Sequence, residues 1–157
     1  MKSLIATYVD YQAADFLTQQ KIILSVDTDF IALRNLEGKS IIEADDATLK
    51  AYRDFLIKCK SQALLIDPSI EAYNPLDEMA HAEFIEKWQR AIEVAQLFKT
   101  SYLYYRIPKV KDVIAENKMV LDLIKQDLNL AMKYKGKVIL KFDDKQTSRV
   151  TSYYEQL

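Results

Sequence analysis

The sequence predicts an α/β protein in which parallel strands alternate with helices. Short, continuous apolar runs recur along the chain, and longer segments with apolar residues every three or four positions lie between them. The apolar runs are too continuous for a sheet with one face in water, which favours a buried parallel sheet. Regular succession of strand, helix and strand is typical of βα units joined by right-handed crossovers. We therefore expect residues 1–157 to form a single α/β domain of about five βα units.

Five segments have the length and composition of buried strands. Pro68 and Pro108 each follow such a segment, at positions where proline cannot continue a central ladder. In the fourth segment, alternation places Tyr102 and Tyr104 on one face of the strand and the residues between and after them on the other. The predicted strands are residues 2–9, Phe30–Leu33, Gln62–Ile66, 102–107 and 138–142.

The segments between the strands have helical periodicity. Asp45 or Asp46 can cap the second helix, and Gly136 lies where a helix C-terminal glycine is expected. Trp88 belongs to the clearest apolar face in the chain, so we expect it in the core, and the single histidine, His81, is expected to have a structural role. The predicted helices are residues 13–26, 47–59, Glu78–Phe98 and 110–134, with a last short helix in 147–157.

Composition excludes several classes of function. Lys and Arg are scattered among Asp and Glu, and the formal net charge is -1. The sequence therefore has no cluster of basic residues of the kind that binds nucleic acid or a membrane surface. No apolar run approaches the roughly 18 residues of a spanning helix, and no signal-peptide pattern follows Met1. The single Cys59 fits a reducing compartment, so we expect a cytoplasmic protein. With only two glycines, the chain has no glycine-rich phosphate loop.

Between Phe30 and Arg106 the chain resembles the sugar isomerase/epimerase family, which is built on the xylose isomerase-like TIM barrel. The resemblance depends on the order of three short motifs. Ile31-Ala32-Leu33-Arg34 with Gly38-Lys39 comes first, Arg90-Ala91-Ile92-Glu93-Val94-Ala95 lies in a helix, and Thr100 precedes a strand that ends at Arg106. The resemblance implies a partial xylose isomerase-like TIM barrel.

The resemblance also implies a divalent metal (Mn, Mg, Zn or Co) that polarises a carbonyl of a small sugar or sugar phosphate while a base moves the neighbouring proton. Two departures from the family pattern bear on this chemistry. Ala32 replaces a glutamate at the end of the second strand, and the glutamate that ends the family's fifth strand falls on Phe142, or on Asp143 if the register shifts by one. Asp143 is therefore the candidate metal ligand, with Asp144 beside it, and no catalytic residue is assigned.

In barrels of this kind the loops after the strand carboxyl ends build the site. This rule selects Arg34, Lys39 and Arg106 as candidate substrate-binding residues, with Ser69 beside them. Arg34 can bind a phosphate or carboxylate, or it can form an ordinary ion pair at a strand end. Lys39 can instead be a solvated loop charge, and Asp143 with Asp144 can form a polar turn before the last helix.

The end of the sequence at Leu157 leaves the ligands of the family's later strands without counterparts. We therefore expect a truncated protein of low or no activity alone, and whether it is an enzyme stays open. The alternative is a non-catalytic binding or assembly module that keeps the barrel-derived fold. Five strands also leave two open sheet edges, through which a homo-oligomer can form.

Overall fold

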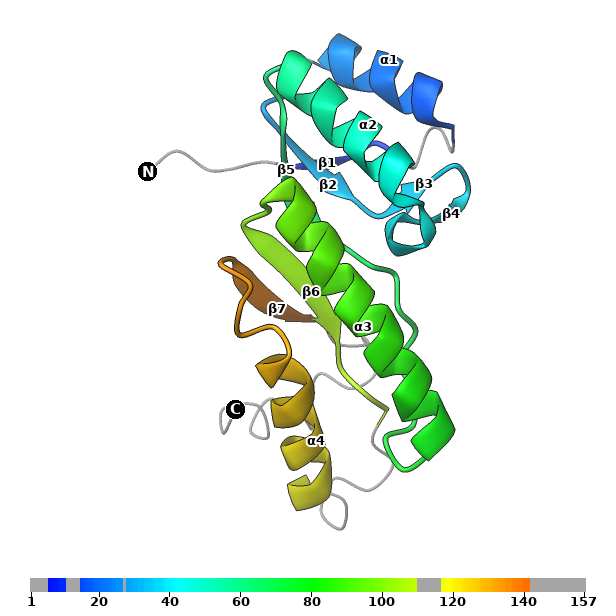
Figure 1. Cartoon of the computed structure of the whole chain (residues 1–157), viewed down its shortest axis with the longest axis vertical. Coiled ribbons are helices and arrows are strands. Elements are labelled where there is room, and N and C mark those ends of the chain that lie inside the picture. Colours follow the sequence, from blue (N-terminus) through cyan, green and yellow to red (C-terminus); the bar gives the residue numbers. More distant parts are fainter. Residues whose placement is uncertain (1–5, 11–14, 27, 110–116, 142–157) are drawn as a thin grey trace.

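The five predicted strands form one parallel sheet (Figure 1). The computed structural model describes residues 6–10, 15–26, 28–109 and 117–141. The strands follow one another across the sheet in the order β1-β2-β5-β6-β7, and every neighbouring pair is parallel. Each crossover therefore leads to the adjacent strand. The strands are β1 (Thr7–Tyr8), β2 (Phe30–Leu33), β5 (Gln62–Ile66), β6 (Tyr102–Arg106) and β7 (Lys137–Lys141).

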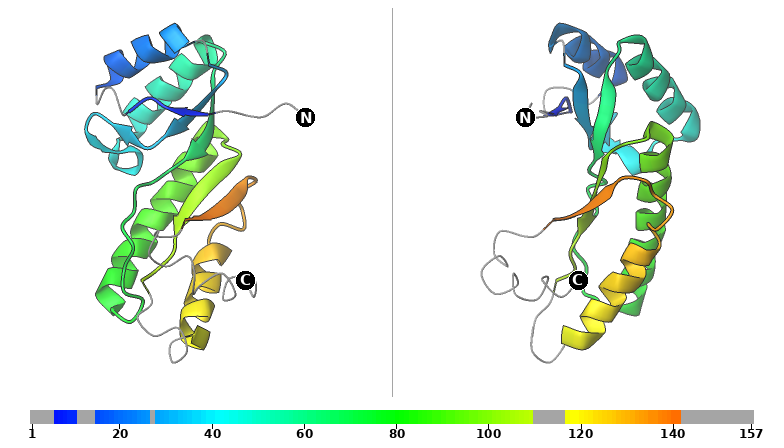
Figure 2. Two further views of the ribbon diagram at one scale, coloured as in Figure 1. Left: turned by 180° about the vertical axis from the view of Figure 1, so that it is seen from behind. Right: turned by 90° about the vertical axis from the view of Figure 1, so that its left-hand side faces the viewer.

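The described helices lie on one side of this sheet (Figures 1 and 2). Helices α2, α3 and α4 pack against one sheet face, and α1 lies beside α2, where the rings of Phe16 and Tyr52 meet edge to face at 4.9 Å. A doubly wound sheet has helices on both faces, whereas a barrel has them only outside. The arrangement is therefore that of a partial barrel. The helices are α1 (Phe16–Val26), α2 (Asp46–Lys58), α3 (Glu78–Phe98) and α4 (Asn117–Asn129).

The alternation predicted for the fourth strand is confirmed. In β6, Leu103 and Tyr105 are fully buried beneath the helices, whereas Tyr102, Tyr104 and Arg106 are partly exposed on the opposite face. The register between β6 and β7 pairs Tyr104 with Ile139 and Arg106 with Lys141. Residues paired in this way share a sheet face. The concave, inner side of the partial barrel therefore has polar and aromatic side chains near the carboxyl ends of these strands.

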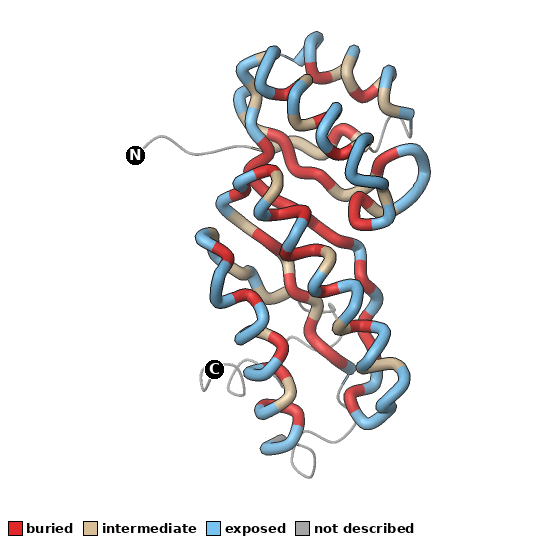
Figure 3. Tube along the Cα trace, in the orientation of Figure 1, coloured by how far each residue is buried: buried red, intermediate tan, exposed pale blue. Residues whose placement is uncertain are grey.

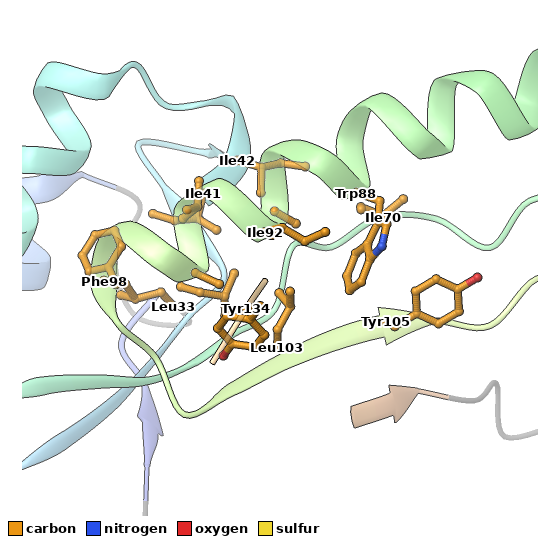
Figure 4. Packing of buried hydrophobic residues seen from close by; sticks show 14 of the residues in the cluster. Leu33, Ile41, Ile42, Ile70, Trp88, Ile92, Phe98, Leu103, Tyr105 and Tyr134 are labelled. Carbon is orange, nitrogen blue, oxygen red and sulfur yellow. The ribbon is translucent and has the colours of Figure 1, made fainter. Parts of the chain in front are cut away.

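The core lies between the sheet and the helices (Figures 3 and 4). Trp88 of α3 is fully buried, as predicted, and its ring meets that of Tyr105 edge to face at 5.1 Å. Helix α3 begins at its N-cap Asp77, whose carboxylate accepts hydrogen bonds from the amides of Met79 and Ala80. This cap and the long apolar stripe explain why α3 has the predicted bounds.

The loop predicted after the second strand contains a small antiparallel hairpin. It joins β3 (Asn35–Leu36) to β4 (Lys39–Ser40), and the short 3-10 helix Ile41–Glu43 follows it. Glu37 and Gly38 have φ of 53° and 77°. Two successive positive φ angles are what a two-residue hairpin turn with the right twist requires. The Gly-Lys motif of the family resemblance is therefore part of a tight turn.

Several predicted bounds differ from the structure. The first strand is described only as Thr7–Tyr8, the helix predicted over 47–59 is Asp46–Lys58, and the strand predicted over 102–107 ends at Arg106. The described part of the helix predicted over residues 110–134 ends at Asn129, and Gly136 is not its C-terminal glycine. A side chain at Gly136 would instead clash with the Tyr134 hydroxyl and lie 2.8 Å from the Ser101 carbonyl oxygen, so close packing requires glycine there. The strand predicted over 138–142 is observed as Lys137–Lys141. The short helix predicted in 147–157 lies outside the described residues, and no helix among the described ones is long and apolar enough to cross a membrane.

Candidate functional site

Charged side chains gather where the parallel strands end. Asp10 follows β1, Arg34 follows β2, Asp67 follows β5, and Arg106 and Lys141 are the last residues of β6 and β7. Since carboxyl ends of parallel strands lie at one edge of the sheet, residues from all parts of the described chain meet there. A polar hollow of about 140 Å³ lies among Arg34, Asp67, Ser69, Tyr104, Arg106 and Lys141.

Asp67 is the centre of this edge. Its carboxylate is almost fully buried, and one oxygen accepts hydrogen bonds from Lys141 Nζ at 2.8 Å and from the Tyr8 hydroxyl at 3.3 Å. The other oxygen accepts from the backbone amide of Ser69 at 3.2 Å, and Ser69 is held in the left-handed region with φ of 52°. Burial and the negative charge of Asp67 raise the pKa of the Tyr8 hydroxyl far above its ordinary value, so that this hydroxyl stays protonated and donates.

Arg34 forms the second charged group of the site. Its Nε lies 2.9 Å from Asp10 Oδ2, which also accepts a 2.7 Å hydrogen bond from the side-chain amide of Asn35. The Arg34 guanidinium lies 4.9 Å from the centre of the Tyr8 ring. The structure thus contains the ion pair at the strand end, which was one of the two interpretations of Arg34 from the sequence. Arg34 nevertheless also lines the hollow, so the pair fixes its position at the site.

The lining of the hollow has more cationic than anionic side chains. Arg34, Arg106 and Lys141 contribute three positive charges, against the carboxylates of Asp67 and Glu71. Lys141 Nζ also lies 5.3 Å from the centre of the Tyr104 ring. Donors on several sides, with an aromatic ring between them, suit a small ligand that carries an anionic group and hydroxyls. A hollow of about 140 Å³ fits a small polar ligand or the charged end of a larger one.

The structure brings two of the three predicted substrate-binding residues together. Arg34 and Arg106 line the same hollow, with Ser69 beside them. Lys39 is exposed in β4 and does not line it. Ala32, which replaces the family's glutamate, is buried in β2.

Sequence reasoning missed four residues of this edge: Tyr8, Asp10, Asp67 and Lys141. Asp67 directly follows a predicted strand, so the rule that selected Ser69 could have selected it too. Lys141 was missed because it was placed inside the predicted strand 138–142 and not at its end, whereas the described strand is Lys137–Lys141. The pairing of Asp10 with Arg34 crosses 24 residues of sequence and has no local signal.

The two buried carboxylates of this edge are paired with cations, Asp67 with Lys141 and Asp10 with Arg34, while Asp10 Oδ1 has no hydrogen-bond partner among the described residues. Two carboxylates that are each beside a cation, one of them with a spare oxygen, are fewer oxygen ligands than a divalent metal usually takes. Within the described ranges no three His, Cys, Asp or Glu side chains come together as a ligand group. The predicted ligand Asp143, with Phe142 and Asp144, lies outside those ranges.

A second polar cluster lies between α3, α4 and β6, behind the hollow. Asp127 is 1% exposed and accepts hydrogen bonds from the hydroxyls of Tyr105 at 2.8 Å and Tyr73 at 3.1 Å. His81 Nε2 lies 3.0 Å from its other oxygen, and Trp88 Nε1 donates to its backbone carbonyl at 2.8 Å. These hydrogen bonds tie α3, α4 and β6 together. These contacts give His81 a structural place beneath the site.

Comparison with known proteins identifies the fold. No protein-family profile and no curated protein matches the sequence. A xylose isomerase domain protein from Planctomyces limnophilus superposes with a TM-score of 0.72 at 8% identity, covering 98% of this chain and 59% of that chain. The IOLI protein with a bound zinc atom superposes with a TM-score of 0.67 at 17% identity, covering 88% of this chain and 51% of that one.

A xylose isomerase-like TIM barrel protein from Mycobacterium smegmatis in complex with magnesium has a TM-score of 0.64 at 11% identity, with 89% of this chain and 56% of that chain covered. The chain thus spans between half and three fifths of the length of these proteins. The chain therefore has the fold of the xylose isomerase-like TIM barrel proteins, over somewhat more than half of their length.

Proposed function

We propose that this chain binds the anionic group of a small sugar phosphate or sugar acid in the hollow at the carboxyl edge of its sheet. The observation that carries the proposal is the convergence of Arg34, Arg106 and Lys141, from three different strands, on one small hollow. An arginine fork matches phosphate and carboxylate oxygens, and a lysine adds a point charge. The exposed carboxylate of Glu71, which also lines the hollow, is an acceptor for sugar hydroxyls beside them.

Position within the fold supports this proposal. Ligands of TIM barrels bind at the carboxyl ends of the strands, and the hollow lies there. The ion pairs with Asp10 and Asp67 fix Arg34 and Lys141 before a ligand arrives, which lowers the entropy lost on binding. The fold alone hosts many reactions, so the proposal depends on these side chains.

Of the two functions that the sequence left open, the described residues favour binding over catalysis. A base for proton transfer next to a carbonyl works best as a carboxylate shielded from water, whereas the buried Asp10 and Asp67 are paired with cations and Glu71 of the lining is exposed. We propose that sugar isomerisation or epimerisation by this chain alone is low or absent. A divalent metal at Asp143 stays a prediction, as does association through the open sheet edges. Calorimetry with Mn²⁺ on the chain and on Asp143→Asn tests the metal.

Isothermal titration calorimetry with ribose 5-phosphate and with ribose tests the proposed binding. We expect saturable binding of the phosphate ester and at least about tenfold weaker binding of the neutral sugar. Arg106→Met keeps the apolar stem of the side chain and removes the fork, so it should weaken ribose 5-phosphate binding by a similar factor. Lys58→Met, an exposed change on α2, is the matched control and should leave binding unchanged.

The three predicted substrate-binding residues can be ranked in the same assay. Lys39→Met should change the affinity little, because Lys39 lies outside the hollow. Equal affinity for ribose and ribose 5-phosphate, or an unchanged affinity in Arg106→Met, would contradict the proposal.

A further inference from the structure

We infer that the opposite edge of the sheet contains a second binding site, which takes a small polyphosphorylated molecule. A larger hollow of about 830 Å³ lies at the amino ends of β6 and β7, between the end of α3 and the loop that leads into β7. This volume is within the range of pockets that hold a small organic ligand. It is distinct from the carboxyl-edge hollow, since the two share no lining residue and lie toward opposite ends of the same strands.

Four lysines surround this hollow. They are Lys99, Lys133, Lys135 and Lys137, and all four are exposed. No ion pair joins any of them to an acidic residue in the part of the chain that the structure describes. Four like charges around one concavity repel one another, and a bound polyanion would relieve that repulsion. The chain as a whole has a net charge of -1, so this concentration of positive charge is local.

The backbone around the hollow is held in place. Lys99 ends α3 in the left-handed region with φ of 52°, and Lys137 begins β7 with its amide donating to the Ser101 carbonyl at 2.8 Å. The backbone positions of two of the four lysines are therefore fixed. Lys133 and Lys135 lie on the chain segment between α4 and β7, and both are exposed (Figure 3).

The floor of the hollow is aromatic and buried. The Tyr134 hydroxyl donates to the Thr100 carbonyl at 2.9 Å and lies 2.9 Å from Thr100 Oγ1, which keeps the phenol ring in place. Gly136 passes over this hydroxyl at a distance that admits no side chain. Tyr102 and Ala95 also line the hollow. A ligand with a ring and several phosphates would place the ring on these groups and the phosphates among the lysines.

Two probes test the site: tripolyphosphate, which has only the charge, and ATP without magnesium, which adds a ring. Both are titrated by calorimetry at low ionic strength, because exposed charges are screened by salt. We expect saturable binding of both, with ATP the tighter, and an affinity that falls as salt is added. The double substitution Lys135→Met with Lys137→Met should weaken both by at least about fivefold.

Two matched variants separate this site from general charge and from the carboxyl edge. Lys58→Met with Lys125→Met removes two exposed lysines elsewhere and should leave binding unchanged, as should Arg106→Met. Equal loss in the control pair, loss in Arg106→Met alone, or no binding of either probe at millimolar concentration would overturn the inference. Binding of an acidic peptide but of neither phosphate probe would overturn it as well. None of these results affects the ribose 5-phosphate assay, so the two proposals can fail separately.

Discussion

Removing the carboxylate of Asp127 should destabilise the protein strongly. The side chain is 1% exposed and accepts from two tyrosine hydroxyls and His81. Asp127→Ala would leave the hydroxyls of Tyr105 and Tyr73, which are 0% and 8% exposed, without their acceptor. Each unsatisfied buried group costs about 1–3 kcal/mol. Because the groups share one acceptor and relax together, we expect a loss of about 3–5 kcal/mol rather than a simple sum.

Urea unfolding followed by tryptophan fluorescence measures this loss. Trp88 is the single tryptophan, and its indole donates to the Asp127 carbonyl, so its emission reports on the cluster itself. Asp122→Ala, an exposed change on the same helix, is the matched control and should lie within about 0.5 kcal/mol of the wild type. Asp127→Asn keeps an acceptor for the hydroxyls and should cost less than Asp127→Ala.

A double-mutant cycle with Tyr105 tests the reasoning further. Tyr105→Phe should cost about 1 kcal/mol in the wild type, where it removes a satisfied hydrogen bond. In the Asp127→Ala background the same change removes an orphaned hydroxyl and should be neutral or stabilising. If Asp127→Ala costs no more than Asp122→Ala, or if Tyr105→Phe has the same cost in both backgrounds, the hydrogen bonds of this cluster do not stabilise the protein as argued.

Two further predictions concern a turn and a helix cap. Gly136→Ala should destabilise the protein by about 1–3 kcal/mol, because a side chain there meets the buried Tyr134 hydroxyl and the Ser101 carbonyl. Gly38→Ala is the comparison: it has open space around the new side chain but a φ of 77°, so its cost measures backbone strain without crowding. Hydrogen bonds from Thr48 hold the pKa of the Asp45 carboxyl below its ordinary value of 3.8, so its stabilising contribution is present above that pH and is lost as the pH falls through the lowered pKa. Asp45→Asn keeps an oxygen acceptor without the titration. The difference in stability between the two proteins should therefore shrink as the pH falls through the lowered pKa, and a difference that does not change with pH would contradict the assignment.

Most of the fold could be predicted from local patterns. Apolar periodicity located α3 at its observed bounds, and alternation in β6 separated Leu103 and Tyr105 from the tyrosines on the inner face. These patterns arise because the buried side of each helix or strand consists mainly of apolar residues. The spacing of those residues can be seen in the sequence. The hairpin of β3 and β4 was missed because strands of two residues have no periodicity to detect.

The candidate site was only partly predictable. Arg34 and Arg106 could be found because they end recognisable strands. The carboxylates that orient Arg34 and Lys141 come from distant parts of the chain, with Asp67 and Lys141 separated by 74 residues. Such pairings follow from strand order and register, which single-residue patterns do not specify. Gly136 shows the same limit: its position suggested a helix end, whereas the structure gives packing against Tyr134 as the reason for glycine.

An NMR titration of the isotope-labelled chain with ribose 5-phosphate locates the bound sugar phosphate. We expect the backbone amide shifts to concentrate at the carboxyl ends of β2, β5, β6 and β7, around Arg34, Ser69, Arg106 and Lys141, and to saturate with one affinity. Shifts that gather instead around Lys99 and Lys135, or that spread evenly over exposed lysines, would contradict a sugar-phosphate site at the carboxyl edge.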